Sequence, residues 1–114
     1  MVIACTKTVS DISIVECRGD INATSMVSLK NMLRRLMERN RSKVVLDIGK
    51  AKHVDLAGLG ILVERIREAR DAEGDIRICN MRPSVRKAFK MVGVYKVLDT
   101  FSSQTSAVRS FQVA

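Results

Sequence analysis

Residues 44–73 of the chain are VVLDIGKAKHVDLAGLGILVERIREARDAE, and this stretch decides the fold class. Val44 to Ile48 is nearly continuous apolar sequence, which is typical of a central parallel strand. A helix is predicted from about Leu56 to Ala72, because apolar residues return there at helical spacing. The small-residue turn Asp55-Leu56-Ala57-Gly58-Leu59-Gly60 joins the two elements. Such a turn presents backbone N–H groups and the positive end of a helix dipole, so we predict the functional surface here.

Two β-rich runs precede this stretch, at residues 2–9 and 12–18, with the turn-forming pair Ser10-Asp11 between them. They predict an antiparallel hairpin at one edge of a sheet. Both faces of the second run are largely apolar, so we expect this strand to be covered on two sides. A helix is predicted over residues 26–40, capped by Thr24 or Ser25. Its inner face is formed by Met26, Leu29, Leu33, Leu36 and Met37.

The rest of the chain continues the alternation of strands and helices. A fourth strand is predicted at residues 75–80. Gly74, just before it, is predicted to be the left-handed residue that ends the helix from Leu56 to Ala72. Pro83 marks the first position of a helix. Residues 94–98 predict a fifth strand, and Ser102 or Ser103 caps a last short helix. The inner face of the helix after Pro83 is predicted to consist of Val85, Phe89 and Val92.

The predicted element order is therefore β-β-α-β-α-β-α-β-α. After the hairpin every connection contains a helix, so the later strands should pair in parallel through right-handed crossovers. We predict a single small α/β domain over residues 1–114. Its sheet is mixed but mostly parallel, with about five strands, an N-terminal β-hairpin and about four helices.

The chain carries a formal net charge of +8, from 20 Lys and Arg against 12 Asp and Glu. The basic residues are densest at 34–43 and 82–90. A nucleic-acid-binding surface usually adds aromatic residues, and this chain has one Tyr, three Phe and no Trp. A solvated basic surface suited to an acidic protein partner is the favoured interpretation.

No membrane span is predicted, because charged residues interrupt every long apolar stretch. No signal sequence is predicted, because the N-terminus lacks a basic region followed by an extended apolar segment. The three cysteines, Cys5, Cys17 and Cys79, are odd in number and lie in predicted strands. We therefore expect reduced core cysteines in a cytoplasmic protein that does not contact a membrane.

Catalytic and cofactor motifs are scarce. His53 is the only histidine, and no CxxC, HExxH or P-loop pattern is present. Gly58 and Gly60 match the start of a dinucleotide fingerprint, but Val63 stands where its third glycine belongs. Asp47 and Asp55 are eight positions apart, and nothing pairs them as acid and base. We expect a non-enzymatic protein without a metal or cofactor.

Several segments resemble the STAS domain, the sulfate-transporter and anti-sigma-factor-antagonist family. They are VVLDI, HVDLAGLGILVERIREA and GDIRICNMRPSVRKAFKMVGVYKVL, and Gly19-Asp20-Ile21-Asn22 extends the match. The most specific element is the Asp-x-x-Gly-Leu turn at Asp55 to Leu59. The resemblance implies a cytoplasmic bacterial protein that binds an anti-sigma factor of the serine kinase type. That factor then releases its sigma factor, so transcription is regulated.

In the family, phosphorylation of a serine in this turn abolishes binding. The two serine positions hold Leu56 and Ala57 here, so the usual site, Ala57, accepts no phosphate. The resemblance implies partner contacts by Asp20, Asn22, Asp55, Leu56, Ala57, Gly58, Leu59 and Gly60. A helix N-cap is an alternative role for Asp55, and tight helix–sheet packing is one for Gly58 and Gly60.

Other functions stay open at this point. The chain is alternatively a STAS subunit or scaffold of another bacterial complex, or a basic nucleic-acid- or nucleotide-binding domain. A nucleotide would use the helix N-terminus as an anion site. The edge strand at residues 2–9 also leaves a homodimer possible, because an unpaired edge can pair with a second chain.

Overall fold

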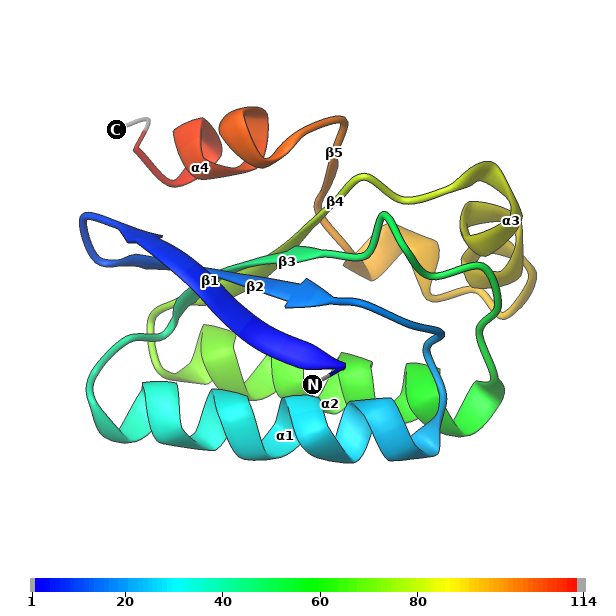
Figure 1. The fold of residues 1–114 in the computed structure, drawn as a ribbon, viewed down its shortest axis with the longest axis horizontal. Coiled ribbons are helices and arrows are strands. Elements are labelled where there is room, and N and C mark those ends of the chain that lie inside the picture. The colour runs from blue at the N-terminus through cyan, green and yellow to red at the C-terminus, as the bar shows by residue number, and fades with distance from the viewer. Residues whose placement is uncertain (1, 113–114) are drawn as a thin grey trace.

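Five strands form one sheet in the order β1-β2-β3-β4-β5 in the computed structural model, which describes residues 2–112 (Figure 1). The strands are β1 Ile3–Val9, β2 Ile12–Cys17, β3 Lys43–Asp47, β4 Asp75–Cys79 and β5 Thr100–Phe101. The helices are α1 Ala23–Glu38, α2 Leu56–Asp71, α3 Pro83–Met91 and α4 Gln104–Gln112, with a 3₁₀ turn, η1, at Tyr95–Val97.

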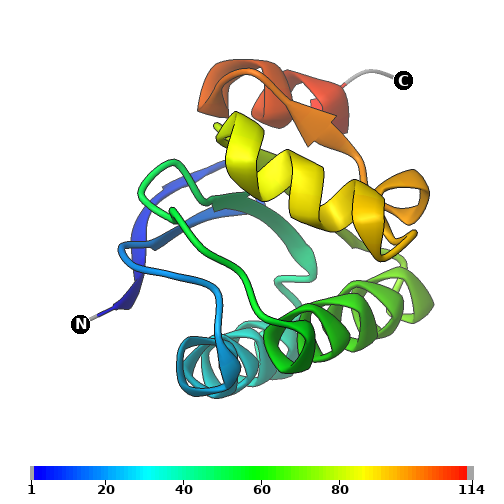
Figure 2. The same cartoon turned by 90° about the vertical axis from the view of Figure 1, so that its right-hand side faces the viewer.

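The sheet is mixed as predicted. β1 pairs with β2 in an antiparallel hairpin, whereas β2–β3, β3–β4 and β4–β5 are parallel. Parallel pairing brings the carboxyl ends of β2, β3 and β4 to one edge of the sheet, which we call the carboxyl edge. The loops that lead into α1, α2 and α3 all leave from this edge (Figure 2). The predicted fold class is confirmed.

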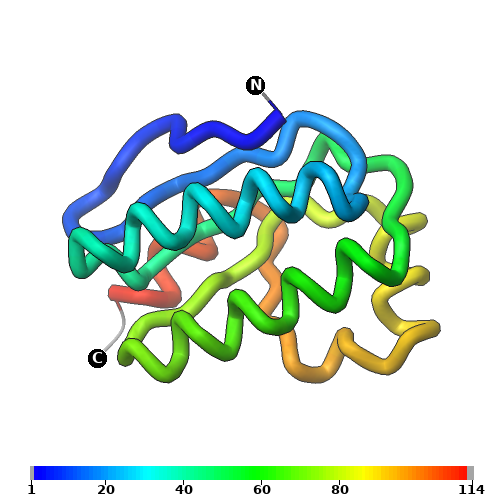
Figure 3. The backbone as a smooth tube through the Cα atoms, turned by 90° about the horizontal axis from the view of Figure 1, so that it is seen from below, coloured from blue at the N-terminus to red at the C-terminus, as the bar shows by residue number. Residues whose placement is uncertain are grey.

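Helices cover both faces of the sheet. α1 and α2 lie side by side on one face, and α4 covers the other (Figures 1 and 3). The larger core lies under α1 and α2 and includes Val15, Leu46 and Phe89. The smaller core joins Ile14 and Val45 to α4. Successive residues of β2 and β3 thus enter opposite cores, which explains why both strands carry apolar residues on both faces.

Residues 94–98 do not form the predicted fifth strand. Residues 95–97 form η1, which packs against α3, and sheet pairing starts only where Ile78 meets Thr100. Leu98 is buried in the larger core. The apolar run therefore serves packing at the end of the sheet. Val92 was also predicted inward, but it follows the last turn of α3 as its C-cap and is exposed.

Two predicted caps were wrong. Asn22, not Thr24 or Ser25, is the N-cap of α1, and Ser25 completes a capping box with it. After α2 the left-handed residue is Glu73, with φ 63°, not Gly74. Gly74 is needed for space, because an added Cβ would overlap the backbone carbonyl of Ser42. Ser103 does cap α4, since its Oγ accepts the N–H of Ser106 at 3.1 Å.

The cysteines divide into two groups. Cys17 and Cys79 are buried core residues as predicted, but Cys5 is exposed on the edge strand β1, so that part of the prediction was wrong. Burial raises the pKa of the Cys79 thiol to about 12, and the carboxylates of Asp47 and Glu16 add to the rise. Burial also raises the pKa of Cys17. Both buried thiols are therefore protonated at neutral pH.

Candidate functional site

The predicted turn lies at the carboxyl edge, where two loops are paired with each other. Ile21 and Val54 form an isolated parallel bridge. The N–H of Ile21 donates to the carbonyl of His53 at 3.0 Å, and the N–H of Asp55 donates to the carbonyl of Ile21 at 2.9 Å. These bonds fix the start of α1 beside the start of α2.

Asp20, in the loop before α1, also binds the loop that leads into α2. One oxygen of its carboxylate accepts the backbone N–H groups of Lys52 at 2.9 Å and His53 at 3.1 Å. These two hydrogen bonds hold the pKa of the Asp20 carboxyl below its usual range. The carboxylate form is favoured by folding, so this clamp is present at neutral pH and weakens as the pH falls through the lowered pKa.

Asn22 and Asp55 cap neighbouring helices in the same way. The Asn22 side chain accepts the N–H of Ser25 at 2.9 Å, and the Ser25 hydroxyl accepts the N–H of Asn22 at 3.0 Å. The Asp55 carboxylate accepts the N–H of Gly58 at 2.8 Å. The alternative role of Asp55 as a helix N-cap is therefore confirmed.

The two glycines of the turn have different surroundings. A Cβ on Gly58 would lie 3.1 Å from both the Cα and the carbonyl carbon of Asn22, so Gly58 permits the close approach of α2 to the start of α1. A Cβ on Gly60 would meet nothing within 4 Å. Close packing therefore accounts for Gly58 and does not account for Gly60.

We expect Gly60→Ala to raise the free energy of unfolding by about 0.5–1 kcal/mol, because alanine restricts the unfolded chain and has space in the helix. Gly58→Ala is expected to lower it by about 1 kcal/mol or more, since the Asn22 backbone is held by hydrogen bonds and cannot yield. Urea unfolding of both variants measures the two shifts. Shifts of the same sign would contradict this account of the turn.

The residues of the turn differ in their exposure to solvent. Leu56 is 70% exposed, and Ala57 and Gly60 are exposed beside it. Leu59 is only 4% exposed and packs in the larger core, and Gly58 is buried too. Of the predicted contact residues in the turn, Leu56, Ala57, Gly60 and the N-cap Asp55 thus offer accessible surface, whereas the buried Gly58 and Leu59 position it.

A second polar network lies at the same edge and was not predicted. The Asp47 carboxylate accepts N–H groups from Gly49 at 2.9 Å, from Asn80 at 2.9 Å and from Gln104 at 2.7 Å. The Asn80 and Gln104 contacts join residues 33 and 57 positions apart, so no local sequence signal could find them. Asp47 is thereby committed to structure, separately from Asp55.

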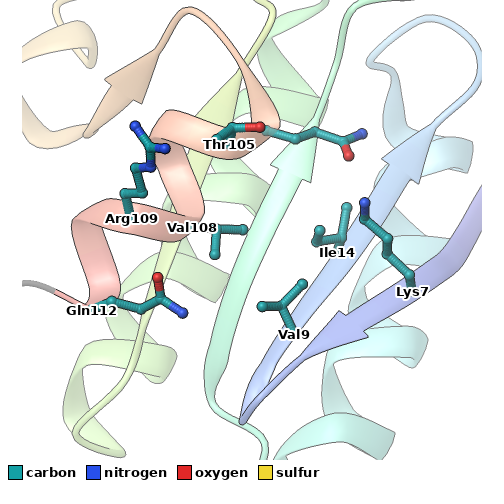
Figure 4. A pocket seen from close by; sticks show the side chains of 8 residues that line it. Lys7, Val9, Ile14, Thr105, Val108, Arg109 and Gln112 are labelled. Atoms are coloured by element: carbon teal, nitrogen blue, oxygen red, sulfur yellow. The ribbon is translucent and has the colours of Figure 1, made fainter.

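A hollow lies away from the turn, between α4 and the β1–β2 hairpin (Figure 4). Its volume is about 260 Å³. Val9, Ile14 and Val108 form its apolar floor, and Lys7 reaches over it from β1. None of the predicted site residues lines it.

The described part of the chain holds neither a metal-binding cluster nor a membrane-spanning helix. Within residues 2–112, no three His, Cys, Asp or Glu side chains are grouped so that they could hold a metal ion. No helix in that range is long and apolar enough to cross a membrane.

A family model described as the STAS domain matches residues 4–107. The chain belongs to the STAS domain family. BtrV of Bordetella bronchiseptica, named as a candidate anti-sigma factor antagonist, is 25% identical over 97 residues, covering 85% of this chain and 84% of BtrV. An anti-sigma F factor antagonist of Paenibacillus polymyxa is 23% identical over 101 residues, covering 88% of this chain and 86% of that protein.

The STAS fold extends over the whole described chain. The unphosphorylated form of the anti-sigma factor antagonist SpoIIAA matches with a TM-score of 0.75 and 13% identity, covering 98% of this chain and 99% of that one. The resemblance inferred from the sequence is therefore confirmed. The turn on which the resemblance was based has Asp55, Gly58 and Leu59, and positions 56 and 57 hold leucine and alanine, which carry no hydroxyl.

Proposed function

We propose that this STAS domain is an anti-sigma factor antagonist that binds an anti-sigma factor of the serine kinase type and so frees a sigma factor. The observation that carries the proposal is the exposed apolar Leu56, 70% accessible at the first position of α2. A large apolar side chain displayed at the start of a capped helix is suited to a protein contact. The names of the curated relatives support the same role.

The rigidity of this surface supports the proposal. Asp20 clamps the loop before α2, and Asn22 and Asp55 cap the two helices that meet at Gly58. Leu56 and Ala57 are therefore held in one arrangement before a partner arrives. Binding to such a surface loses less conformational entropy than binding to a mobile loop.

Substitution of Ala57 by aspartate tests the contact. We expect the affinity for the anti-sigma factor to fall about 100-fold in titration calorimetry, because a charge is placed in a packed interface. Aspartate in the first turn of a helix interacts favourably with the dipole, so the variant should fold. The loss can then be assigned to the interface.

Ala72→Asp is the matched control. Ala72 is exposed and follows the last residue of α2, about 24 Å from its start at the usual helical rise. The control should bind with the affinity of the natural chain. Equal affinities for Ala57→Asp and the natural chain would place the interface elsewhere.

The missing hydroxyl gives a second expected result. We expect the natural chain to stay bound to the kinase-type factor in the presence of ATP, because Leu56 and Ala57 accept no phosphate. The Ala57→Ser variant should be phosphorylated and released, since a phosphate adds about −1.5 to −2 charge at the contact. Native mass spectrometry with and without ATP follows both. ATP-dependent release of the natural chain would show a switch at another residue.

A further inference from the structure

α3 and η1 form a basic surface without acidic residues. Residues 76–98 contain no Asp or Glu and six Lys or Arg. Five of the six are exposed on or beside α3 and η1: Arg82, Arg86, Lys87, Lys90 and Lys96. Within residues 2–112, none of these five forms an ion pair. Their charge is therefore available to a partner.

Apolar side chains are exposed on the same segment. Met91 is 77% exposed, Val97 42% and Val92 39%. They account for half of the large exposed hydrophobic residues of the described chain, the others being Val2, Val27 and Leu56. Several exposed apolar side chains close together in one segment, with basic residues among them, are typical of an interaction surface.

Two shallow hollows flank Lys90. One, of about 420 Å³, lies between Lys90 and Met91 and is also lined by Pro83, Arg86 and Lys87. The other, of about 260 Å³, is lined by Gly93, Tyr95 and Lys96 beside Lys90. The Lys90 side chain lines both hollows, and its ammonium lies 5.1 Å from the centre of the Tyr95 ring, close enough for a cation–π contact. Each hollow thus combines apolar walls with a cationic rim.

We propose that this surface, which we call the α3 surface, docks an acidic protein segment whose apolar side chains enter the two hollows. The segment belongs to the anti-sigma factor partner, so this inference rests on the proposed function. Glutamate or aspartate side chains of the segment meet Lys87, Lys90 and Lys96. Its apolar side chains cover Met91 and Val97.

The surroundings favour a protein segment over the two other anionic partners. A nucleic acid gains little from Met91 or Val97, and Tyr95, the one aromatic residue that lines either hollow, is half-buried and already carries Lys90. A membrane surface needs a broad apolar face. The apolar face of α3, with Val85 and Phe89, is already buried in the core.

The position of α3 allows one partner to contact both surfaces. Nε of Arg82 donates to the carbonyl of Gly49 at 2.7 Å, and the hydroxyl of Ser84 donates to the carbonyl of Lys52 at 3.4 Å. These bonds tie the start of α3 to the loop that leads into α2. α3 and the start of α2 face the same side of the molecule in Figure 2.

The test uses a fluorescein-labelled amphipathic helical peptide with glutamates on one face and leucines on the other. We expect the natural chain to raise its fluorescence anisotropy, and the glutamine version of the peptide to bind at least about tenfold more weakly. The Lys87→Glu/Lys90→Glu variant should lose the glutamate peptide. Arg34→Glu/Arg35→Glu on α1 makes the same change in net charge and should retain it.

The second measurement uses the anti-sigma factor. The Lys87→Glu/Lys90→Glu variant should associate about tenfold more slowly than the natural chain, with a weaker dependence of the rate on salt. Met91→Ser should weaken the complex without changing that dependence. Normal binding by these variants, together with loss of binding by Ala57→Asp, would overturn the α3 surface and leave the proposed function standing.

The remaining outcomes are equally decisive. Loss of binding by the Lys87→Glu/Lys90→Glu variant with normal binding by Ala57→Asp would confirm the α3 surface and reject the turn as the contact. A natural chain that ignores the glutamate peptide but binds vesicles of anionic lipid or a DNA duplex through Lys87 and Lys90 would overturn the inference. The occupant would then be a membrane or a nucleic acid.

Discussion

Replacing Phe89 by alanine is expected to lower the free energy of unfolding by about 3–5 kcal/mol. The Phe89 side chain is fully buried and is among the largest in the core. It projects from α3, a helix of nine residues that is too short to be stable alone. Removal of the ring leaves a cavity at the point where α3 meets the larger core. Urea unfolding followed by circular dichroism gives the change.

Met91→Ala is the matched control on the same helix. Met91 is 77% exposed, so its truncation should change the free energy of unfolding by no more than about 0.5 kcal/mol. The comparison separates burial from helix propensity, because both variants place alanine in α3. A loss below about 1 kcal/mol for Phe89→Ala would show that the core collapses around the missing ring.

The fold class was predictable because each main element has its own periodicity. Val44 to Ile48 is apolar except for Asp47, and its first four residues proved to lie in β3. The apolar side chains of this stretch are divided between the two cores. Leu29 and Leu33 lie four positions apart and proved to share the buried face of α1. Patterns of this kind depend only on local sequence and burial, so one chain is enough to detect them.

The prediction was wrong at residues 94–98 because apolar content alone does not distinguish a strand from a packed turn. Val94 and Leu98 contribute to the core in either arrangement. Their pairing depends on the path of the chain from α3 back to β4. That path is set by the left-handed Gly93, with φ 77°, and by the packing of α3 at the end of the sheet.

The strand and the helix that flank the candidate site were predictable, whereas the contacts that hold them together were not. The prediction that Asp55 to Gly60 form the functional surface stays a prediction. The clamp by Asp20 joins residues 32 and 33 positions apart, and the contact between Gly58 and Asn22 depends on how two helices pack. Such contacts are decided by the tertiary fold, so the sequence alone carries no sign of them.

Asp75→Ala is expected to be the most damaging single change outside the apolar core, lowering the free energy of unfolding by about 3–5 kcal/mol. The buried Asp75 carboxylate accepts from Nε of Arg70 at 3.0 Å and from Nε of Arg77 at 3.2 Å. It also accepts the N–H of Ile76 at 2.9 Å. Removal leaves two guanidinium groups without their shared partner.

Arg70 and Arg77 connect Asp75 to η1 and α4, so the loss of Asp75 should also affect these elements. Arg70 also donates to the carbonyl of Val97 at 2.9 Å. Arg77 donates to the hydroxyl of Ser110 at 2.8 Å and lies 4.1 Å from the centre of the Phe111 ring. Asp75 thus links α2, η1 and α4 through β4, so its loss should loosen all three. Hydrogen exchange should rise in α4 as well as in β4.

Asp11→Ala supplies the control for this prediction. Asp11 also pairs with a basic residue, Lys43 at 3.1 Å, but its side chain is 61% exposed. Water screens such a pair, so the free energy of unfolding should change far less than it does for Asp75→Ala. Similar losses for Asp11→Ala and Asp75→Ala in urea unfolding would contradict the role of Asp75 as a buried link. A large loss for Asp75→Ala alone would show that burial, and not ion pairing as such, makes this carboxylate important to the fold.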